Sequence, residues 1–316
     1  MQPFKKDVVK ITHEINNIHM KQNRKTNAVK MMASALFLAG LSITFYSCKK
    51  EKNDTLETIA SAEDNSTAEN EFTSVFDVTD DFASNDARTR GGNTILPSGA
   101  VVSFTDSSYS DGDGIECTID FGPLKSIAPY GLLCNDGRYR AGLLHISSTN
   151  RYGIVGSVFT VTANDADQYY GGSLPTSLTQ LTGTIALSRV STNSVNIKVS
   201  NATATNSNGK VSWQSDRTIT KTVDPGIGLL GDEFDITGSA SGVNRNGENF
   251  TITIDKALHK KIELGCARTF VVGQITLTNT TSNKTIKIDY DPFSNAACDL
   301  IAKATINNKE FTYVVR

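Results

Sequence analysis

The chain has 316 residues with 31 basic and 33 acidic side chains, and its formal net charge is −2. The basic residues do not gather into a stripe, which argues against nucleic acid as a partner. With so balanced a charge, attachment to a membrane would have to come from a lipid rather than from electrostatic attraction.

Residues 1–47 have the features of an export leader. Met31–Tyr46 is an apolar run interrupted only by small or hydroxyl side chains, and several Lys and Arg residues precede it. The run is shorter than the about 20 apolar residues that cross a bilayer as a helix. A basic flank before a short apolar run is typical of a signal peptide. Met20, which directly precedes the basic flank, is a better start for this leader than Met1.

The residues around Cys48 resemble the end of a bacterial lipoprotein leader, where cleavage leaves a cysteine as the first residue. Small Ser47 fits the position before the cleavage site, and SCKKEKND from Ser47 onward is similar to the mature start of Bacteroidetes-type lipoproteins. The resemblance implies that Cys48 carries acyl chains such as palmitate. An ordinary signal peptide, or an uncleaved anchor with an incidental cysteine, is the alternative.

The same resemblance implies a location. In the enteric sorting convention an Asp directly after the cysteine retains a lipoprotein at the inner membrane, and this chain has Lys49 there. We therefore expect an outer-membrane lipoprotein, held by its lipid at the cell surface or on the periplasmic face.

Residues 48–90 are predicted to be an acidic flexible tether. From residue 49 to residue 90 the segment holds eleven acidic and five basic side chains and is rich in Asn, Ser and Thr. A segment so poor in large apolar side chains buries too little surface to offset the entropy of ordering. One alternative stays open, because a short apolar cluster could form an amphipathic turn or a docked strand: Phe72, Val75, Phe76, Val78 and Phe82.

Residues 91–316 are predicted to form an all-β domain. Alternating runs such as Val195–Val199 and Thr285–Asp289 place apolar side chains on one face and polar ones on the other. Turn sequences rich in Asn and Gly separate the runs, and short connections make neighbouring strands antiparallel. We expect a meander of about a dozen strands. The pattern leaves open whether they form a sandwich, a curled sheet or a barrel.

A weak internal repeat runs through this domain. Three strands end at an Asp and are followed by a loop that contains a Cys: Asp120 with Cys134, Asp255 with Cys266, and Asp289 with Cys298. This ending also resembles uncharacterised Bacteroidetes lipoproteins, and that resemblance, over residues 115–316, implies no activity.

Four cysteines besides Cys48 predict two disulfides, because an even set in an exported chain usually pairs. The spacing favours Cys117 with Cys134 and Cys266 with Cys298, since each pair brackets one loop between neighbouring strands. The two other connectivities remain open. No Cys or His spacing fits a zinc site, and we expect no cofactor.

An acidic turn is the one metal candidate of the sequence. Asp111, Asp113 and Glu116 could offer carboxylate oxygens to calcium. The turn does not fit the EF-hand template, because Tyr109 would fall at the first ligand position. A plain acidic turn before a strand is the simpler interpretation.

Three aromatic residues are the candidate ligand contacts. Trp213, Tyr169 and Tyr170 could stack on a sugar or an apolar ligand. The alternation of Trp213 with Val211 favours a place in the core, and the two tyrosines could equally fill a loop. His145 and His259 have no recognisable catalytic partner in the sequence, and no hydrolase or nucleotide-binding motif is present.

These features predict a lipid-anchored envelope protein and not an enzyme. Its β domain would be a binding or structural module for a glycan or an envelope protein. A lipid or small-molecule carrier with a cavity enclosed by strands is the alternative, and a glycan hydrolase is a third possibility.

Overall fold

The computed structural model describes residues 49–84, 95–109, 111–224, 231–262, 270–299 and 301–314. The chain divides into two compact units, Met1–Lys52 and Asn53–Arg316. The predicted leader and Cys48 lie outside the described residues. Within the described ranges, no helix has both the length and the apolar character needed to cross a membrane.

Sixteen strands in the described residues form one sheet. They are β1 (Val101–Asp106), β2 (Ile115–Asp120), β3 (Leu132–Leu133), β4 (Tyr139–Ala141), β5 (Leu143–Ser148), β6 (Val158–Ala163), β7 (Tyr170–Leu174), β8 (Ser177–Arg189), β9 (Ser194–Asn206), β10 (Gly209–Val223), β11 (Glu233–Val243), β12 (Asn249–Lys261), β13 (Val272–Asn279), β14 (Lys284–Asp289), β15 (Ile301–Ile306) and β16 (Lys309–Val314). A short 3₁₀ helix, η1 (Asp165–Asp167), follows β6.

The order of the strands is that of a meander. It runs β1-β2-β5-β6-β8-β9-β10-β11-β12-β13-β14-β15-β16, and every pairing is antiparallel. Strands β3, β4 and β7 form a small branch that joins β8. The predicted all-β antiparallel meander is confirmed, and of the arrangements left open it is a single open sheet rather than a closed barrel.

The ends of the strands form two opposite margins of the sheet, which are distinct from its edge strands β1 and β16. These two margins differ. The first, which we call the hairpin edge, carries the turn β7–β8 and the hairpins β9–β10, β11–β12, β13–β14 and β15–β16. The second, the loop edge, carries the connections β5–β6, β8–β9 and β10–β11. The short hairpins are rich in Asn and Gly because their tight turns need positive φ, as at Asn283 and Gly209.

Alternation along the strands gives the sheet an inner and an outer face. In β9, Val195, Ile197 and Val199 are buried, whereas Lys198 between them is exposed. The inner face therefore presents a continuous apolar surface, and a sheet with one apolar face needs another element to cover it.

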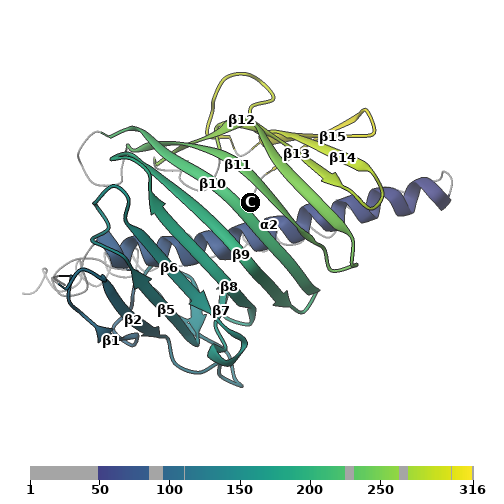
Figure 1. Ribbon diagram of the computed structural model, residues 1–316. Coiled ribbons are helices and arrows are strands. Elements are labelled where there is room, and N and C mark those ends of the chain that lie inside the picture. Colours follow the sequence, from purple (N-terminus) through teal and green to yellow (C-terminus); the bar gives the residue numbers. More distant parts are fainter. Residues whose placement is uncertain are drawn as a thin grey trace, which may run out of the picture. The chain divides into compact units, whose positions relative to one another are not determined.

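A long helix, α2 (Lys49–Ser84), covers this inner face (Figure 1). Its part from Asn53 onward belongs to the second unit. Five apolar side chains of the helix are among the buried core residues: Ala68, Phe72, Val75, Val78 and Phe82. They recur every three or four residues, which places them along one stripe of a helix.

The predicted flexible tether is wrong for Lys49–Ser84. The physical reason is that the five apolar residues find a complete apolar partner in the sheet, so the entropy of ordering the segment is offset. The alternative of an amphipathic turn was nearer to the structure, although it covered only the last part of the helix. Residues 85–90 of the predicted tether lie outside the described residues.

The predicted pairing of Cys117 with Cys134 is also wrong. Both residues are free thiols and are buried, with 3 % exposure each. Cys117 points to the inner face of β2, and the Cys134 thiol contacts the Leu132 carbonyl oxygen at 3.7 Å. Both therefore act as small apolar core residues. Cys266 lies outside the described residues, so its pairing with Cys298 stays a prediction.

We expect the thiols of Cys117 and Cys134 to resist alkylation in the folded protein and to react fully in denaturant. Burial raises the pKa of the Cys117 thiol to about 12 and also raises the pKa of Cys134, and only the thiolate is nucleophilic. Peptide mass mapping after iodoacetamide treatment in buffer and in denaturant measures this. A disulfide-linked peptide pair containing both residues would contradict it.

Candidate functional site

We call the buried interface between α2 and the inner face of the sheet the trough. It contains two of the three aromatic residues singled out from the sequence. Trp213 on β10 is 4 % exposed, and its ring stacks on that of Phe72 with centroids 5.4 Å apart. Its indole N–H donates to Asn65 Oδ1 at 2.9 Å. The interpretation of Trp213 as a core residue is therefore correct, and its ring is not open to a sugar.

The two tyrosines do not share a site with each other. Tyr169 is 1 % exposed, and burial raises the pKa of its hydroxyl to about 12. Its ring lies against that of Phe121, with centroids 6.0 Å apart. Tyr170, the first residue of β7, is half-buried, and its hydroxyl donates to Gln168 Oε1 at 3.0 Å. Of the three predicted ligand contacts, only Tyr170 has a partly exposed ring.

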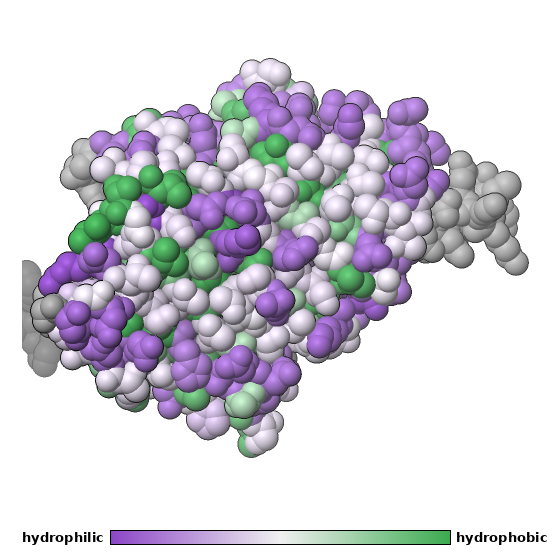
Figure 2. All heavy atoms as spheres, viewed as in Figure 1, coloured by the Kyte–Doolittle hydropathy of each residue, from purple (hydrophilic) through white to green (hydrophobic). Residues whose placement is uncertain are grey.

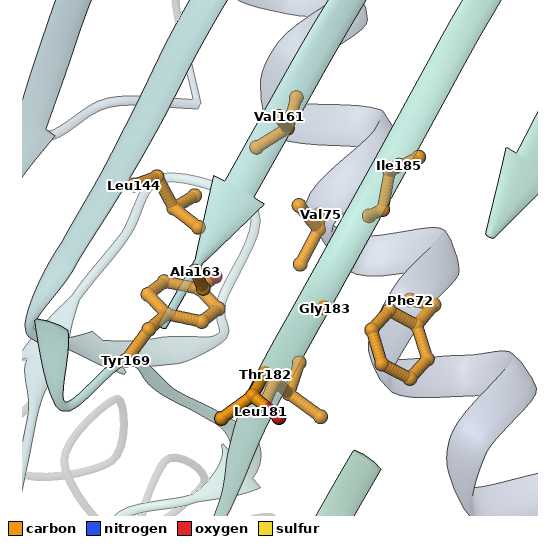
Figure 3. Close-up of a pocket in the computed structure, with 10 residues that line it drawn as sticks. All are labelled: Phe72, Val75, Leu144, Val161, Ala163, Tyr169, Leu181, Thr182, Gly183 and Ile185. Atoms are coloured by element: carbon orange, nitrogen blue, oxygen red, sulfur yellow. The ribbon is translucent and has the colours of Figure 1, made fainter. Parts of the chain in front are cut away.

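A small apolar cavity lies where α2 meets β5, β6 and β8 (Figure 3). Phe72 and Val75 from the helix close it on one side, and Tyr169 closes it on another. It encloses at most about 220 Å³ of empty space. Pockets for small molecules usually measure about 300–1,000 Å³, so this cavity is too small for a lipid while α2 is in place.

A bulge in β8 lies beside the cavity. Gly183 has φ +131°, and the pairing with β9 shifts between Thr182 and Thr184. A Cβ atom at Gly183 would lie 2.6 Å from the Ala202 Cα atom. Only glycine permits this approach of β8 to β9.

Arginine side chains of the sheet bind acidic side chains of α2 along the trough. Arg217 Nη2 lies 2.8 Å from Glu69 Oε2, and Arg138 Nη2 lies 2.7 Å from Glu71 Oε2. Arg245 contacts Glu63, and its Nε lies 3.1 Å from Asp64 Oδ1. The acidic side chains of α2 therefore bind the sheet as well as interact with water.

Hydrogen bonds hold both ends of the docked helix. At the hairpin edge, Asn244 Nδ2 donates to Ser61 Oγ at 2.9 Å, and Asn279 Nδ2 does so at 3.4 Å. Near the loop edge, the Tyr152 hydroxyl donates to Asp80. Because these contacts need specific partners, they fix the position of α2 along its own axis.

Arg140 is a fully buried charge that forms an ion pair with Asp136. It is 0 % exposed, and its Nη1 and Nη2 donate to the two carboxylate oxygens of Asp136 at 2.9 and 2.6 Å. Nη2 also donates to Ser74 Oγ of α2 at 2.6 Å. Burial acts to raise the pKa of Asp136, but hydrogen bonding and attraction to Arg140 outweigh it and hold that pKa below its ordinary value.

The acidic turn brings together a set different from the predicted one. Carboxylate oxygens of Asp106, Asp111 and Asp113 lie within 4.8 Å of one another, whereas Glu116 is not part of this group. A hydrogen bond that protonated Asp113 donates to Asp111, together with repulsion between the two carboxylates, raises the pKa of Asp113. The turn is exposed, and exposed acidic groups of this kind are common without a metal ion. Calcium binding stays a prediction.

Both histidines of the β domain have partners that the sequence did not reveal. His145 Nδ1 lies 3.1 Å from Thr118 Oγ1, and its Nε2 lies 2.9 Å from Asp167 Oδ1. His259 lies between Asp235 and Glu233, at 2.7 and 3.1 Å. These partners come from neighbouring strands and from η1. A hydroxyl, an imidazole and a carboxylate in contact can support proton transfer, but catalysis also needs donors aimed at the reacting oxygen.

The chain was compared with protein-family models, with curated proteins and with solved structures, and no match was found.

Proposed function

We propose that the protein is an outer-membrane lipoprotein of the cell envelope, anchored by lipid on Cys48, with a β body that binds a partner without catalysis. The leader and the residues around Cys48 support the anchor. One structural observation carries the proposal further: α2 starts at Lys49, the residue after Cys48, and is buried in the body from Ser61 onward. An acyl group on Cys48 would thus lie only five residues before Asn53, where the second unit begins.

The exposed side chains favour an envelope protein over a glycan as the partner. Stacking on a sugar needs exposed aromatic rings, and Trp213 and Tyr169 are buried under α2. The loop edge, by contrast, exposes Ile154, Val155 and Val190 to 45, 53 and 51 %. Figure 2 shows an apolar group at this margin of an otherwise mostly polar face. Exposed apolar side chains that gather in one place are typical of protein interfaces.

The carrier alternative requires a change in the structure. The trough is the apolar surface that a carrier would use, and α2 fills it with Phe72, Val75 and their neighbours. A lipid could enter only if the helix left, which would break the contacts of Ser61, Asp64 and Glu69 with the sheet. We therefore prefer the binding module.

We expect the protein isolated from its native membranes to begin at Cys48 and to carry acyl chains there. Intact-mass spectrometry and analysis of the N-terminal peptide measure this. A Cys48→Ala variant should lose the acyl mass and should no longer partition into detergent. An unmodified Cys48 thiol, or a leader still attached, would contradict the proposed anchor.

A further inference from the structure

We propose that the hairpin edge of the sheet docks against the lipid bilayer, with an apolar cluster of Leu124, Ile127, Leu133 and Leu174 entering the boundary between head groups and acyl chains. The inference rests on the proposed anchor at Cys48. It adds which surface of the body faces the membrane and what holds it there.

The first step is the reach of the chain. Ser61 is held at the hairpin edge by Asn244, which follows β11, and by Asn279, which ends β13. Five residues from Cys48 to Asn53 span at most about 18 Å in any conformation. The helix from Asn53 to Ser61 rises about 12 Å. An anchor on Cys48 therefore lies within about 30 Å of the hairpin edge, whereas a flexible tether to residue 91 would permit about 150 Å.

The second step is the apolar cluster on the same edge. Leu124, Ile127, Leu133 and Leu174 are exposed to 42, 80, 51 and 60 %. Leu124 and Ile127 lie in the loop that leaves β2 at this edge, and Leu174 lies at the β7–β8 turn. Leu133 is on β3, which pairs with β4, and β4 pairs with β7. Two backbone hydrogen bonds join these segments: Lys125 N–H to the Tyr130 carbonyl at 2.8 Å, and Tyr130 N–H to the Pro175 carbonyl at 2.9 Å.

The third step is the shape of the edge. Between the apolar cluster and the start of the docked helix lie the β9–β10, β11–β12 and β13–β14 hairpins, which follow one another along the lower edge of the sheet in Figure 1. From β7 to β13 the edge is about 30 Å long, at about 4.8 Å per strand. Its hairpins are mostly Asn, Gly, Ser and Thr, which suit the hydrated head-group layer. The chain from the anchor joins the edge near one end at Ser61, and the apolar cluster lies at the other, so both contacts together would hold the whole edge on the membrane surface.

A second contact would orient the body on the membrane. The acyl chains expected on Cys48 would attach the protein, and apolar side chains that enter the boundary between head groups and acyl chains would add buried area at one defined surface. Four exposed aliphatic side chains supply apolar area that only a lipid or protein environment can bury. Their position on the edge where the chain from Cys48 first meets the body favours the bilayer.

The loop edge is the competing surface, because Ile154, Val155 and Val190 are also exposed. The docked helix reaches that edge at its far end, where Asp80 accepts a hydrogen bond from Tyr152. From Ser61 to Asp80 the helix rises about 28 Å, so the chain that leads from Cys48 first meets the body at the hairpin edge and reaches the loop edge only at the far end of the docked helix. Docking at the hairpin edge leaves the loop edge facing away from the membrane, where a partner could reach it.

The test uses the chain from Cys48 to Arg316, coupled through its N-terminal cysteine to a lipid thioester, a reaction specific for a cysteine with a free amino group. Because the anchor is made chemically, the result does not depend on whether cells acylate Cys48. The coupled protein is placed in phosphatidylcholine vesicles that contain dansyl-labelled head groups. Trp213 is the single tryptophan, so energy transfer from it to dansyl reports the distance of the body from the membrane.

We expect Ile127→Asp with Leu174→Asp to lower energy transfer several-fold relative to the wild type. The matched control, Val155→Asp with Val190→Asp at the loop edge, should leave it unchanged. All four positions are exposed, so an unchanged Trp213 emission in solution verifies the fold of each variant. Equal transfer in the wild type and the hairpin-edge variant would overturn the proposal, and so would a loss in the loop-edge variant.

Discussion

Replacing Phe72 with alanine should lower the free energy of unfolding by about 3–5 kcal/mol and shift the emission of Trp213 to longer wavelength. Phe72 is 4 % exposed and stacks on Trp213 in the trough. It also borders the apolar cavity, so the substitution enlarges an existing space that the surroundings have not closed. The loss should therefore lie toward the upper part of that range, because the cost grows with residual cavity volume. Urea denaturation followed by tryptophan fluorescence measures both effects.

Thr73→Ala is the matched control, because Thr73 is the next residue of the same helix and is exposed. It should change the unfolding free energy by less than about 0.5 kcal/mol. If Phe72→Ala left stability and emission as they are in the wild type, α2 would not be part of the core. The prediction of a flexible tether for this segment would then be correct.

The strands could be predicted because their signal is local. The alternation in Val195–Val199 and Thr285–Asp289 falls within β9 and β14. The Asn- and Gly-rich sequences between runs became the tight hairpins of one edge. Whether the sheet is open or closed could not be predicted, because this depends on which element covers its inner face. The covering element lies outside the segment that has the β pattern.

The helix was missed because its stabilising partners are distant in the sequence. Asp64 and Arg245 are 181 residues apart, and Asn65 and Trp213 are 148 residues apart. Counted within residues 49–90 alone, the acidic side chains indicate solvation and disorder. The spacing of Phe72, Val75 and Val78 was the one signal that indicated a helix. It becomes decisive only when the apolar face of the sheet is known, because that face is the surface on which the helix packs.

The candidate site shows the same limit. The partners of His145 and His259 come from adjacent strands and from η1, and no spacing in the sequence joins them. For Cys117 and Cys134, an even count of cysteines favoured a bridge, whereas each thiol instead fills a place in the core. The alternation that placed Trp213 beside Val211 was a better guide, because it follows from the geometry of a strand.

Replacing Arg140 with methionine should lower the free energy of unfolding by about 3–5 kcal/mol, the usual cost of removing one partner of a buried ion pair. Methionine keeps much of the volume of the side chain, so the loss reports the charge more than the packing. Asp136 would lose two hydrogen bonds, and Ser74 of α2 would lose those to its hydroxyl and carbonyl oxygens. Arg151→Met is the control, because Arg151 is exposed and its guanidinium lies over the Tyr109 ring. It should cost less than about 1 kcal/mol.

The pH dependence separates loss of the ion pair from general damage to the core. The pKa of Asp136 is lowered in the folded protein, mainly through Arg140, which overcomes the effect of burial. The unfolded chain therefore binds this proton more readily, and the stability that Asp136 contributes is present above its ordinary pKa of 3.8 and is lost as the pH falls through the lowered value. In Arg140→Met, burial without its counter-charge should raise the pKa of Asp136, so this acid-dependent loss should disappear. Unfolding curves of both proteins between pH 7 and about pH 3 measure the difference. Parallel curves would show that Asp136 does not depend on Arg140 for its charge.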